Sequence, residues 1–106
     1  MSYIIIICTT SNIDNAKNIA NHLVSNKLAA CVNIIPQIVS IYEWNNQIQQ
    51  DSECILFIKT HNSLFDKVKE EIIDLHPYEL PEIISITIDR GHTEYLDWLK
   101  KCILVQ

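Results

Sequence analysis

The residues best suited to chemistry lie in one short stretch, His76-Pro77-Tyr78-Glu79-Leu80-Pro81-Glu82, which holds an imidazole, a phenol and two carboxylates. Each of its two prolines fixes its own φ and keeps the preceding residue out of the α region. The preceding helix is therefore expected to end at or just before His76, and the stretch to stay extended and stiff. We expect it to form one wall of any site that this protein has.

Cys8 and His76 are candidate ligands for a soft metal ion. Cys8 ends an apolar run that predicts a central strand, and the end of such a strand can approach the loop that contains His76. A thiolate and an imidazole suit copper or zinc, and a carboxylate of Glu79 or Glu82 could complete the set. Each residue could instead have a structural role. For Cys8 the sequence alone favours burial in the core over metal binding. For His76 a hydrogen bond to nearby backbone and metal binding are equally open.

Glu79 and Glu82 could instead act as a carboxylate pair in acid–base chemistry or in binding hard cations. They stand three residues apart on extended chain and need not converge, so a solvated loop or a salt bridge to Lys59 is favoured over catalysis.

Nucleophilic catalysis has little support in the sequence. The four cysteines lie in apolar contexts that disfavour a reactive thiolate. No serine stands in an elbow motif, and an acyl-phosphate hydrolase of the fold inferred below would need an arginine early in the chain. The one arginine is Arg90, so we predict that the protein is not an enzyme.

Composition and charge exclude several partners. The 106 residues fit one domain, 1–106, and 48% of them are hydrophobic, enough for a core. The net charge of −5 makes nucleic acid and anionic membranes poor partners. The single glycine excludes the usual glycine-rich phosphate loops. The predicted first strand also offers isoleucines where an RNA-binding sheet needs aromatic residues.

The location predicted from the sequence is the cytoplasm. The longest apolar run is far too short to span a membrane, and the first residues lack the basic region of a signal peptide. The four cysteines contain no CxxC pair and are too sparse for a disulfide scaffold, so we expect them to be reduced.

Hydrophobic periodicity predicts seven elements. Asparagines 45 and 46 tolerate positive φ and predict a hairpin turn, and Pro36 predicts a bulge, bend or edge position. The expected elements are a strand over 3–10, a helix capped by Ser11 or Asn12 and ending near 26–27, a strand from 29 to 44, a strand from 47 or 48 to 60, a helix capped by Asn62 or Ser63, a strand over 83–88 and a short helix capped by Thr93.

This β-α-β-β-α-β-α order matches an α+β, ferredoxin-like βαββαβ sandwich with an additional C-terminal helix. Two helices cover only one face of its four-stranded sheet, yet the first strand is apolar on both faces. The long hairpin between the second and third strands carries Tyr42 and Trp44, and its far end is expected to project. Because an apolar face and an exposed strand edge need a partner, we predict an oligomer. Trp44 could line a cleft between subunits, but an interface anchor is favoured.

Several segments carry a family resemblance. They are Leu28-Ala29-Ala30-Cys31-Val32-Asn33-Ile34 with Pro36, Ser40-x-Tyr42-x-Trp44 with Ile48, Glu53 and Lys59-Thr60, His76-Pro77-Tyr78-Glu79-x-Pro81-Glu82-Ile83, and Tyr95-Leu96-x-Trp98-Leu99. From Ile5 to about Leu99, the chain resembles the CutA divalent-cation tolerance family.

The resemblance implies a ferredoxin-like fold and a tight homotrimer similar to PII signalling proteins. It also implies a link to tolerance of copper and other divalent metals. The implied copper ligands match Cys8 and His76. The residues expected at the clefts or interfaces between subunits are Tyr42, Trp44, Lys59, Tyr78 and Trp98.

Two positions depart from the family pattern. Leu75 replaces a second histidine that some members carry before His-Pro-Tyr, and Asn46 replaces a glycine that is usual in the hairpin turn. The function that we predict is a non-enzymatic, cytoplasmic homotrimer that binds divalent metal ions, most of all Cu²⁺, and serves the response to them. The alternative is a PII-like sensor that binds a small molecule or protein partner at clefts between subunits.

Overall fold

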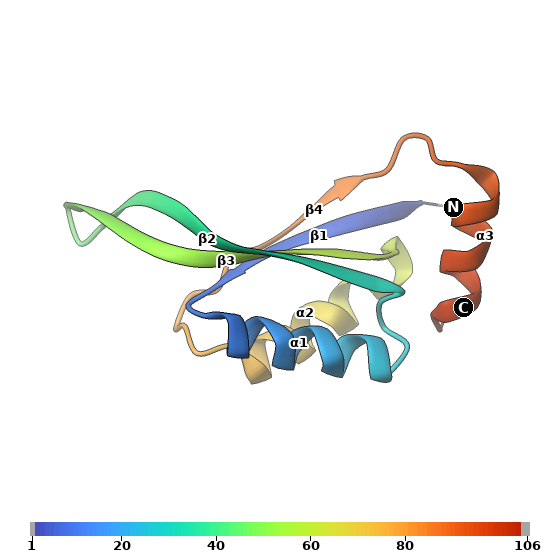
Figure 1. Ribbon diagram of the computed structural model, residues 1–106, viewed down its shortest axis with the longest axis horizontal. Coiled ribbons are helices and arrows are strands. Elements are labelled where there is room, and N and C mark those ends of the chain that lie inside the picture. Colours follow the sequence, from blue (N-terminus) through green and yellow to red (C-terminus); the bar gives the residue numbers. More distant parts are fainter. Residues whose placement is uncertain (1, 105–106) are drawn as a thin grey trace.

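The computed structural model describes residues 2–104. Its order of elements confirms the βαββαβα pattern expected from the sequence (Figure 1). In chain order the elements are β1 (Tyr3–Thr10), α1 (Ile13–Ser25), β2 (Cys31–Trp44), β3 (Gln47–His61), the short 3-10 helix η1 (Asn62–Leu64), α2 (Phe65–Leu75), β4 (Ile83–Thr87) and α3 (Thr93–Cys102).

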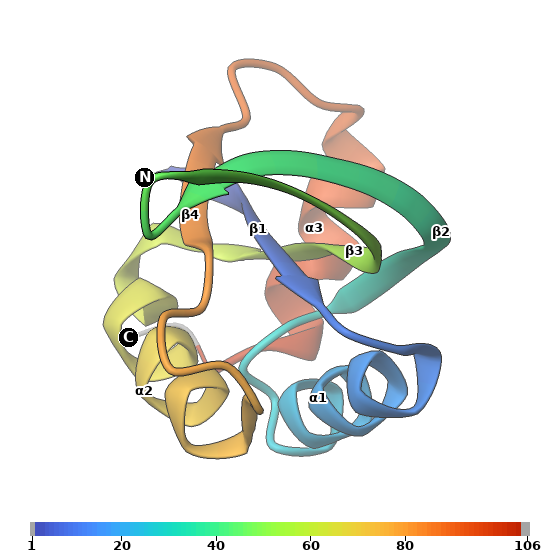
Figure 2. The same cartoon turned by 90° about the vertical axis from the view of Figure 1, so that its left-hand side faces the viewer.

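The four strands form one sheet in the order β2-β3-β1-β4, with every neighbouring pair antiparallel. β1 is therefore a central strand, as its continuous apolar sequence predicted. α1 and α2 lie side by side against one face of the sheet, and α3 lies at the end where β1 begins (Figures 1 and 2). The α+β, ferredoxin-like fold with an extra C-terminal helix is confirmed.

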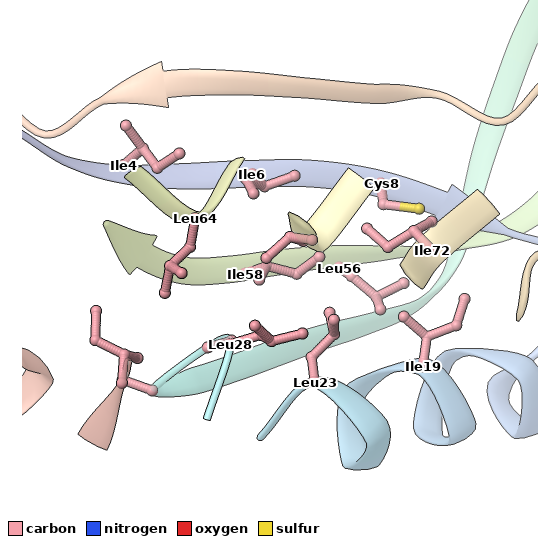
Figure 3. Packing of buried hydrophobic residues seen from close by; sticks show 14 of the residues in the cluster. Ile4, Ile6, Cys8, Ile19, Leu23, Leu28, Leu56, Ile58, Leu64 and Ile72 are labelled. Carbon is pink, nitrogen blue, oxygen red and sulfur yellow. The ribbon is translucent and has the colours of Figure 1, made fainter. Parts of the chain in front are cut away.

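The core lies between this face of the sheet and the two helices. Ile4, Ile6 and Cys8 alternate along β1 toward the helices, because successive side chains of a strand point to opposite faces. Figure 3 shows them with Leu56 and Ile58 of β3 and with residues of α1 and α2. Burial of an apolar side chain of this size stabilises the fold by about 1.5–3 kcal/mol.

The helix ends follow local hydrogen bonding. Asn12 caps α1 by accepting a bond from the backbone N–H of Asn15 at 2.9 Å, as predicted. The cap expected from Asn62 or Ser63 on the next helix is wrong: η1 precedes α2, and Nδ1 of His61 accepts from the N–H of Ser63 at 3.0 Å. The backbone of His61 is extended at the end of β3, so its ring can accept from the N–H two residues later in the chain, as Asp and Asn side chains do in an Asx-turn.

The end of α2 and the start of α3 also test the sequence predictions. α2 ends at Leu75 and His76 is extended, as expected for a residue before proline. Thr93 is not the cap that was expected for the last helix. It is the first residue of α3, which has His92 at its N-cap without a side-chain bond.

β2 and β3 continue past the helices as a long hairpin arm (Figure 1). Asn45 and Asn46 have φ of 52° and 63°, which confirms the predicted turn. The pairing shifts between Ile35 and Ile38, which confirms an irregularity at the intervening proline, a residue without an N–H for the ladder.

The second face of the sheet, which we call the open face, has neither α1 nor α2 on it. Ile84 and Ile86 of β4 lie there, opposite Ile7 and Ile5, and both are more than half exposed. Ile35 of β2 extends the apolar surface toward the arm. Within residues 2–104, no helix has the length and apolar character needed to cross a membrane.

Candidate functional site

A cavity of about 520 Å³ lies between the hairpin arm and the proline-flanked loop over 76–82. We call this cavity the acidic cleft, because half of the residues that surround it are carboxylates. Its lining residues are Thr9, Tyr42, Glu43, Trp44, Asp51, Glu53, Tyr78, Glu79, Leu80 and Glu82.

One wall of the acidic cleft is a single face of the arm. Tyr42 pairs with Gln49, so the alternation of β3 places Asp51 and Glu53 on the same face as Tyr42. The hydroxyl of Tyr42 donates a short hydrogen bond to Asp51, its diagonal neighbour across the two strands. This bond to the carboxylate raises the pKa of Tyr42, with smaller effects of burial and of Glu53.

The loop closes onto the arm through Tyr78 and Glu53. The hydroxyl of Tyr78 donates to Oε2 of Glu53 at 2.7 Å, and Glu53 is only 8% exposed. Burial, followed by this hydrogen bond, strongly raises the pKa of Tyr78. The phenol therefore remains a donor at neutral pH, which stabilises a buried carboxylate on the wall of the cleft.

His76 holds the loop against the end of β1. Its Nδ1 accepts from the backbone N–H of Tyr78 at 3.0 Å, so the other ring nitrogen carries the proton. Nε2–H then donates to the carbonyl oxygen of Thr9 at 2.6 Å. The ring is buried, and both of its nitrogens are used in backbone bonds, which is the structural role that the sequence left open.

Cys8 lies beneath the cleft instead of lining it. Its side chain is fully buried among core residues, and its thiol contacts the carbonyl oxygen of Thr9 at 3.7 Å. Burial, with added repulsion from Glu82 and Glu53, raises the pKa of Cys8 to about 12. The sulfur is thus a protonated core thiol at neutral pH, as the sequence alone favoured.

The four residues predicted to bind metal therefore separate into two pairs. Glu79 and Glu82 line the acidic cleft, whereas Cys8 and His76 are buried and do not line it. In the described part of the chain, no group of three or more histidine, cysteine, aspartate or glutamate side chains is placed to hold a metal ion. In this arrangement neither residue presents a donor atom to a copper ion, because the sulfur of Cys8 is buried and protonated and both ring nitrogens of His76 are bonded to backbone groups.

The five residues expected at a cleft or interface also separate. Tyr42, Trp44 and Tyr78 line the acidic cleft. Lys59 and Trp98 lie toward the other end of the sheet, where Nζ of Lys59 is 3.4 Å from the hydroxyl of Tyr95. The Tyr95 and Trp98 rings are 5.4 Å apart, so the three residues form what we call the Lys59 cluster. Within residues 2–104, Lys59 has no salt bridge to Glu79 or Glu82.

Asp51 and Glu53 are the site residues that sequence reasoning missed. The sequence contains the pattern that could have identified them. The asparagine turn sets the strand pairing, which places Tyr42 opposite Gln49, and Asp51 and Glu53 follow at every second residue. A two-residue period therefore places both carboxylates beside the phenol.

Comparison with known proteins gives consistent results. The family model "CutA1 divalent ion tolerance protein" matches residues 4–102. A Thermus thermophilus protein named "Divalent-cation tolerance protein CutA" is 43% identical over 97 residues, which cover 92% of this chain and 94% of the relative. The Arabidopsis thaliana "Protein CutA, chloroplastic" is 45% identical over 92% of this chain, which spans about half (53%) of that relative.

The solved structure of CutA1 from Oryza sativa superposes with a TM-score of 0.97 at 40% identity, covering 100% of this chain and 97% of that chain. The names of these relatives are not those of enzymes. The match includes every strand and helix described above, apart from Tyr3 at the start of β1. The chain therefore belongs to the CutA1 divalent ion tolerance protein family.

Proposed function

We propose that this protein is a non-enzymatic homotrimer that binds divalent cations in the cytoplasm, with Cu²⁺ as the first ion to test. The observation that carries this proposal is the concentration of negative charge around the acidic cleft. A cleft lined by charge of one sign raises the local concentration of ions of the other sign. Within residues 2–104 none of its five carboxylates forms an ion pair: Glu43, Asp51, Glu53, Glu79 and Glu82.

Glu79 and Glu82 are the proposed first contacts of an incoming cation, because they line the cleft on the loop. Copper binding by Cys8 and His76 is a further part of the proposal, and it has a structural requirement. His76 must give up its bond to Thr9, and Nε2 must lose its proton, before that nitrogen can donate a lone pair to a metal. Because the buried ring is bonded at both nitrogens, binding of an ion requires the loop to rearrange, and the loss of one such hydrogen bond costs about 1 kcal/mol.

The open face and the arm support association with two further copies. Ile84 and Ile86 leave apolar surface beside the central strand, and β2 is an edge strand over its whole length. Monomeric soluble proteins rarely leave a large apolar sheet face in water. The four free cysteines support a reducing compartment. A buried, protonated Cys8 supports a role other than nucleophilic catalysis.

Calorimetric titration of Cu²⁺ and Zn²⁺ into the protein, with its mass measured by light scattering in the same buffer, tests the proposal. We expect saturable binding to a trimer, and loss of copper binding in His76→Ala. His92→Ala is the matched control, because His92 is an exposed histidine at the start of α3. A monomeric mass, or the same copper affinity in both variants, would contradict the proposal.

A second candidate is a PII-like sensor that binds a small molecule in clefts between subunits. The observation that favours a small-molecule ligand is the acidic cleft, which a single chain lines: sites for small molecules usually measure about 300–1,000 Å³ and contain aromatic side chains. A small organic molecule that binds the protein in the absence of metal would favour this candidate over the first.

A further inference from the structure

Three observations limit what the acidic cleft can bind. The first is that its negative charge is spread along the cleft. Glu43, Asp51 and Glu53 come from the arm, and Glu79 and Glu82 come from the loop opposite. A metal ion needs several oxygen atoms that converge on one point. The described carboxylates contain no such group, so they suit a longer cation whose charges are separated.

The second observation is the aromatic lining. Tyr42, Trp44 and Tyr78 share the cleft with the carboxylates, and Leu80 adds apolar surface. Aromatic rings attract ammonium groups through their electron-rich faces and also cover aliphatic chain. Ring carbons and leucine methyl groups cannot coordinate a bare metal ion. This lining therefore favours a cation that has both charged and apolar parts.

The third observation is Glu53. It is only 8% exposed, and one oxygen, Oε2, accepts from the hydroxyl of Tyr78. In the described part of the chain no donor bonds the other oxygen, Oε1, and no cation pairs with the carboxylate. Oε1 is not one of the fully buried unpartnered atoms of the described chain, so it keeps some accessible surface on which a cation can bind. The cleft that Glu53 lines is the place from which such a cation can reach it.

We infer that the acidic cleft binds an organic ammonium compound, specifically an aliphatic diamine or polyamine whose charged ends reach carboxylates on the arm and on the loop. This inference rests on the second candidate function, the small-molecule sensor, and names its class of ligand. The methylene chain between the ammonium groups packs against Tyr42, Trp44 and Tyr78. An ammonium group at the arm donates to the free oxygen of Glu53.

A matched series of four-carbon probes tests the charge requirement. Putrescine carries two positive charges, 1,4-butanediol carries none and succinate carries two negative charges, while their chain lengths are alike. Each probe is titrated calorimetrically into the metal-free full chain at low and at high salt. We expect saturable binding of putrescine alone, weakened by salt because screening reduces attraction between charges.

Two variants test the position of the site. Glu53→Gln removes the charge and keeps an oxygen that can accept from Tyr78. If Glu53→Gln does not fold, Asp51→Asn removes a charge at an exposed position and keeps an oxygen that can accept from Tyr42. Each is expected to weaken putrescine binding about tenfold or more, as for loss of a charged hydrogen bond. Glu70→Gln, an equal change on the exposed side of α2, is expected to leave the affinity unchanged.

Each outcome decides the inference. No saturable binding of putrescine, or an affinity unchanged in both cleft variants, overturns it. Equal or tighter binding of succinate or butanediol, with loss of that binding in Asp51→Asn, overturns the ammonium ligand but supports a small-molecule sensor. If no probe binds while Cu²⁺ binds as proposed above, the sensor function fails with the inference and the metal-binding function stands.

Discussion

Both faces of the sheet carry isoleucines, but α1 and α2 cover one face and leave the open face exposed (Figure 1). Ile6 and Ile58 face the helices and are 0% exposed, whereas Ile84 and Ile86 face the other way and are 52% and 54% exposed. Ile84 pairs with Ile7, the direct neighbour of Ile6 along β1. One residue of offset thus separates the side chains that form the core of the monomer from those that stay exposed on the open face.

The largest change in stability is expected on the covered face. Ile58→Ala is expected to lower the free energy of unfolding by about 2–5 kcal/mol, because it removes buried methyl groups and leaves a cavity. Urea unfolding followed by circular dichroism measures the change. Ile73→Ala, at a 53% exposed position of α2, is the control and is expected to change stability by less than about 0.5 kcal/mol. Similar losses in both variants would refute the distinction between covered and exposed isoleucines.

The open face gives the second prediction, which concerns association instead of folding. Ile86→Lys is expected to weaken the proposed self-association at least about tenfold, because the proposed interface would bury a lysine ammonium without a partner. Sedimentation velocity over a range of concentrations measures the mass. Circular dichroism should show that the fold survives. Ile73→Lys makes the same change on α2 and should leave the mass as it is; an unchanged mass in Ile86→Lys would remove the open face from the interface.

The sequence predicted the fold well, because the fold depends on local patterns. Alternating and helical periodicity, the proline before Tyr78 and the two asparagines of the turn place the strands, the end of α2 and the hairpin where the structure has them. The failures lie at two helix starts. The bond from His61 to Ser63 depends on a ring orientation at the end of β3, and propensity does not encode that orientation.

The site was less predictable, because its residues meet only after the chain folds. The sequence indicated the proline-flanked loop as a wall, and Tyr78, Glu79 and Glu82 do line the acidic cleft. It did not indicate that Asp51 and Glu53 of the arm lie beside Tyr42 on the opposite wall. Nor could it show whether His76 faces a ligand or the backbone, since that depends on the distance of Thr9 from its ring.

A third prediction compares the two buried histidines, His61 at the end of β3 and His76 after α2. His76 has partners on both ring nitrogens, whereas Nε2 of His61 has none in the described part of the chain. Burial, with a smaller effect of positive charge from Lys100, lowers the pKa of His61. Its folded pKa thus lies below the usual value of about 6.5, and the unfolded chain binds the proton more readily. The stabilising contribution of His61 is complete above pH 6.5 and is lost as the pH falls through the lowered pKa.

The measurement is the urea midpoint from pH 7.5 down to pH 5. His61→Asn keeps an acceptor for the N–H of Ser63 but does not titrate, so it should flatten the fall in the midpoint below pH 6.5. His92→Asn is the control, because His92 is exposed and makes no side-chain cap bond. A slope that is the same in His61→Asn and the original chain would show that His61 is not the group responsible.

The smallest effect is expected at the tip of the arm, where neither face of the sheet contributes burial. Asn46 has a φ of 63°, in the left-handed region that glycine adopts without cost and asparagine at a modest one. Asn46→Gly makes the Asn-Gly pair that such turns favour and should stabilise the chain by a few tenths of a kcal/mol up to about 1 kcal/mol. Asn46→Ala should destabilise it, because its Cβ clashes in this conformation and no polar side chain compensates. Thermal unfolding of both variants separates turn geometry from packing. If glycine and alanine shifted the melting temperature in the same direction, the arm would depend on contacts of the Asn46 side chain and not on the backbone conformation that its φ describes.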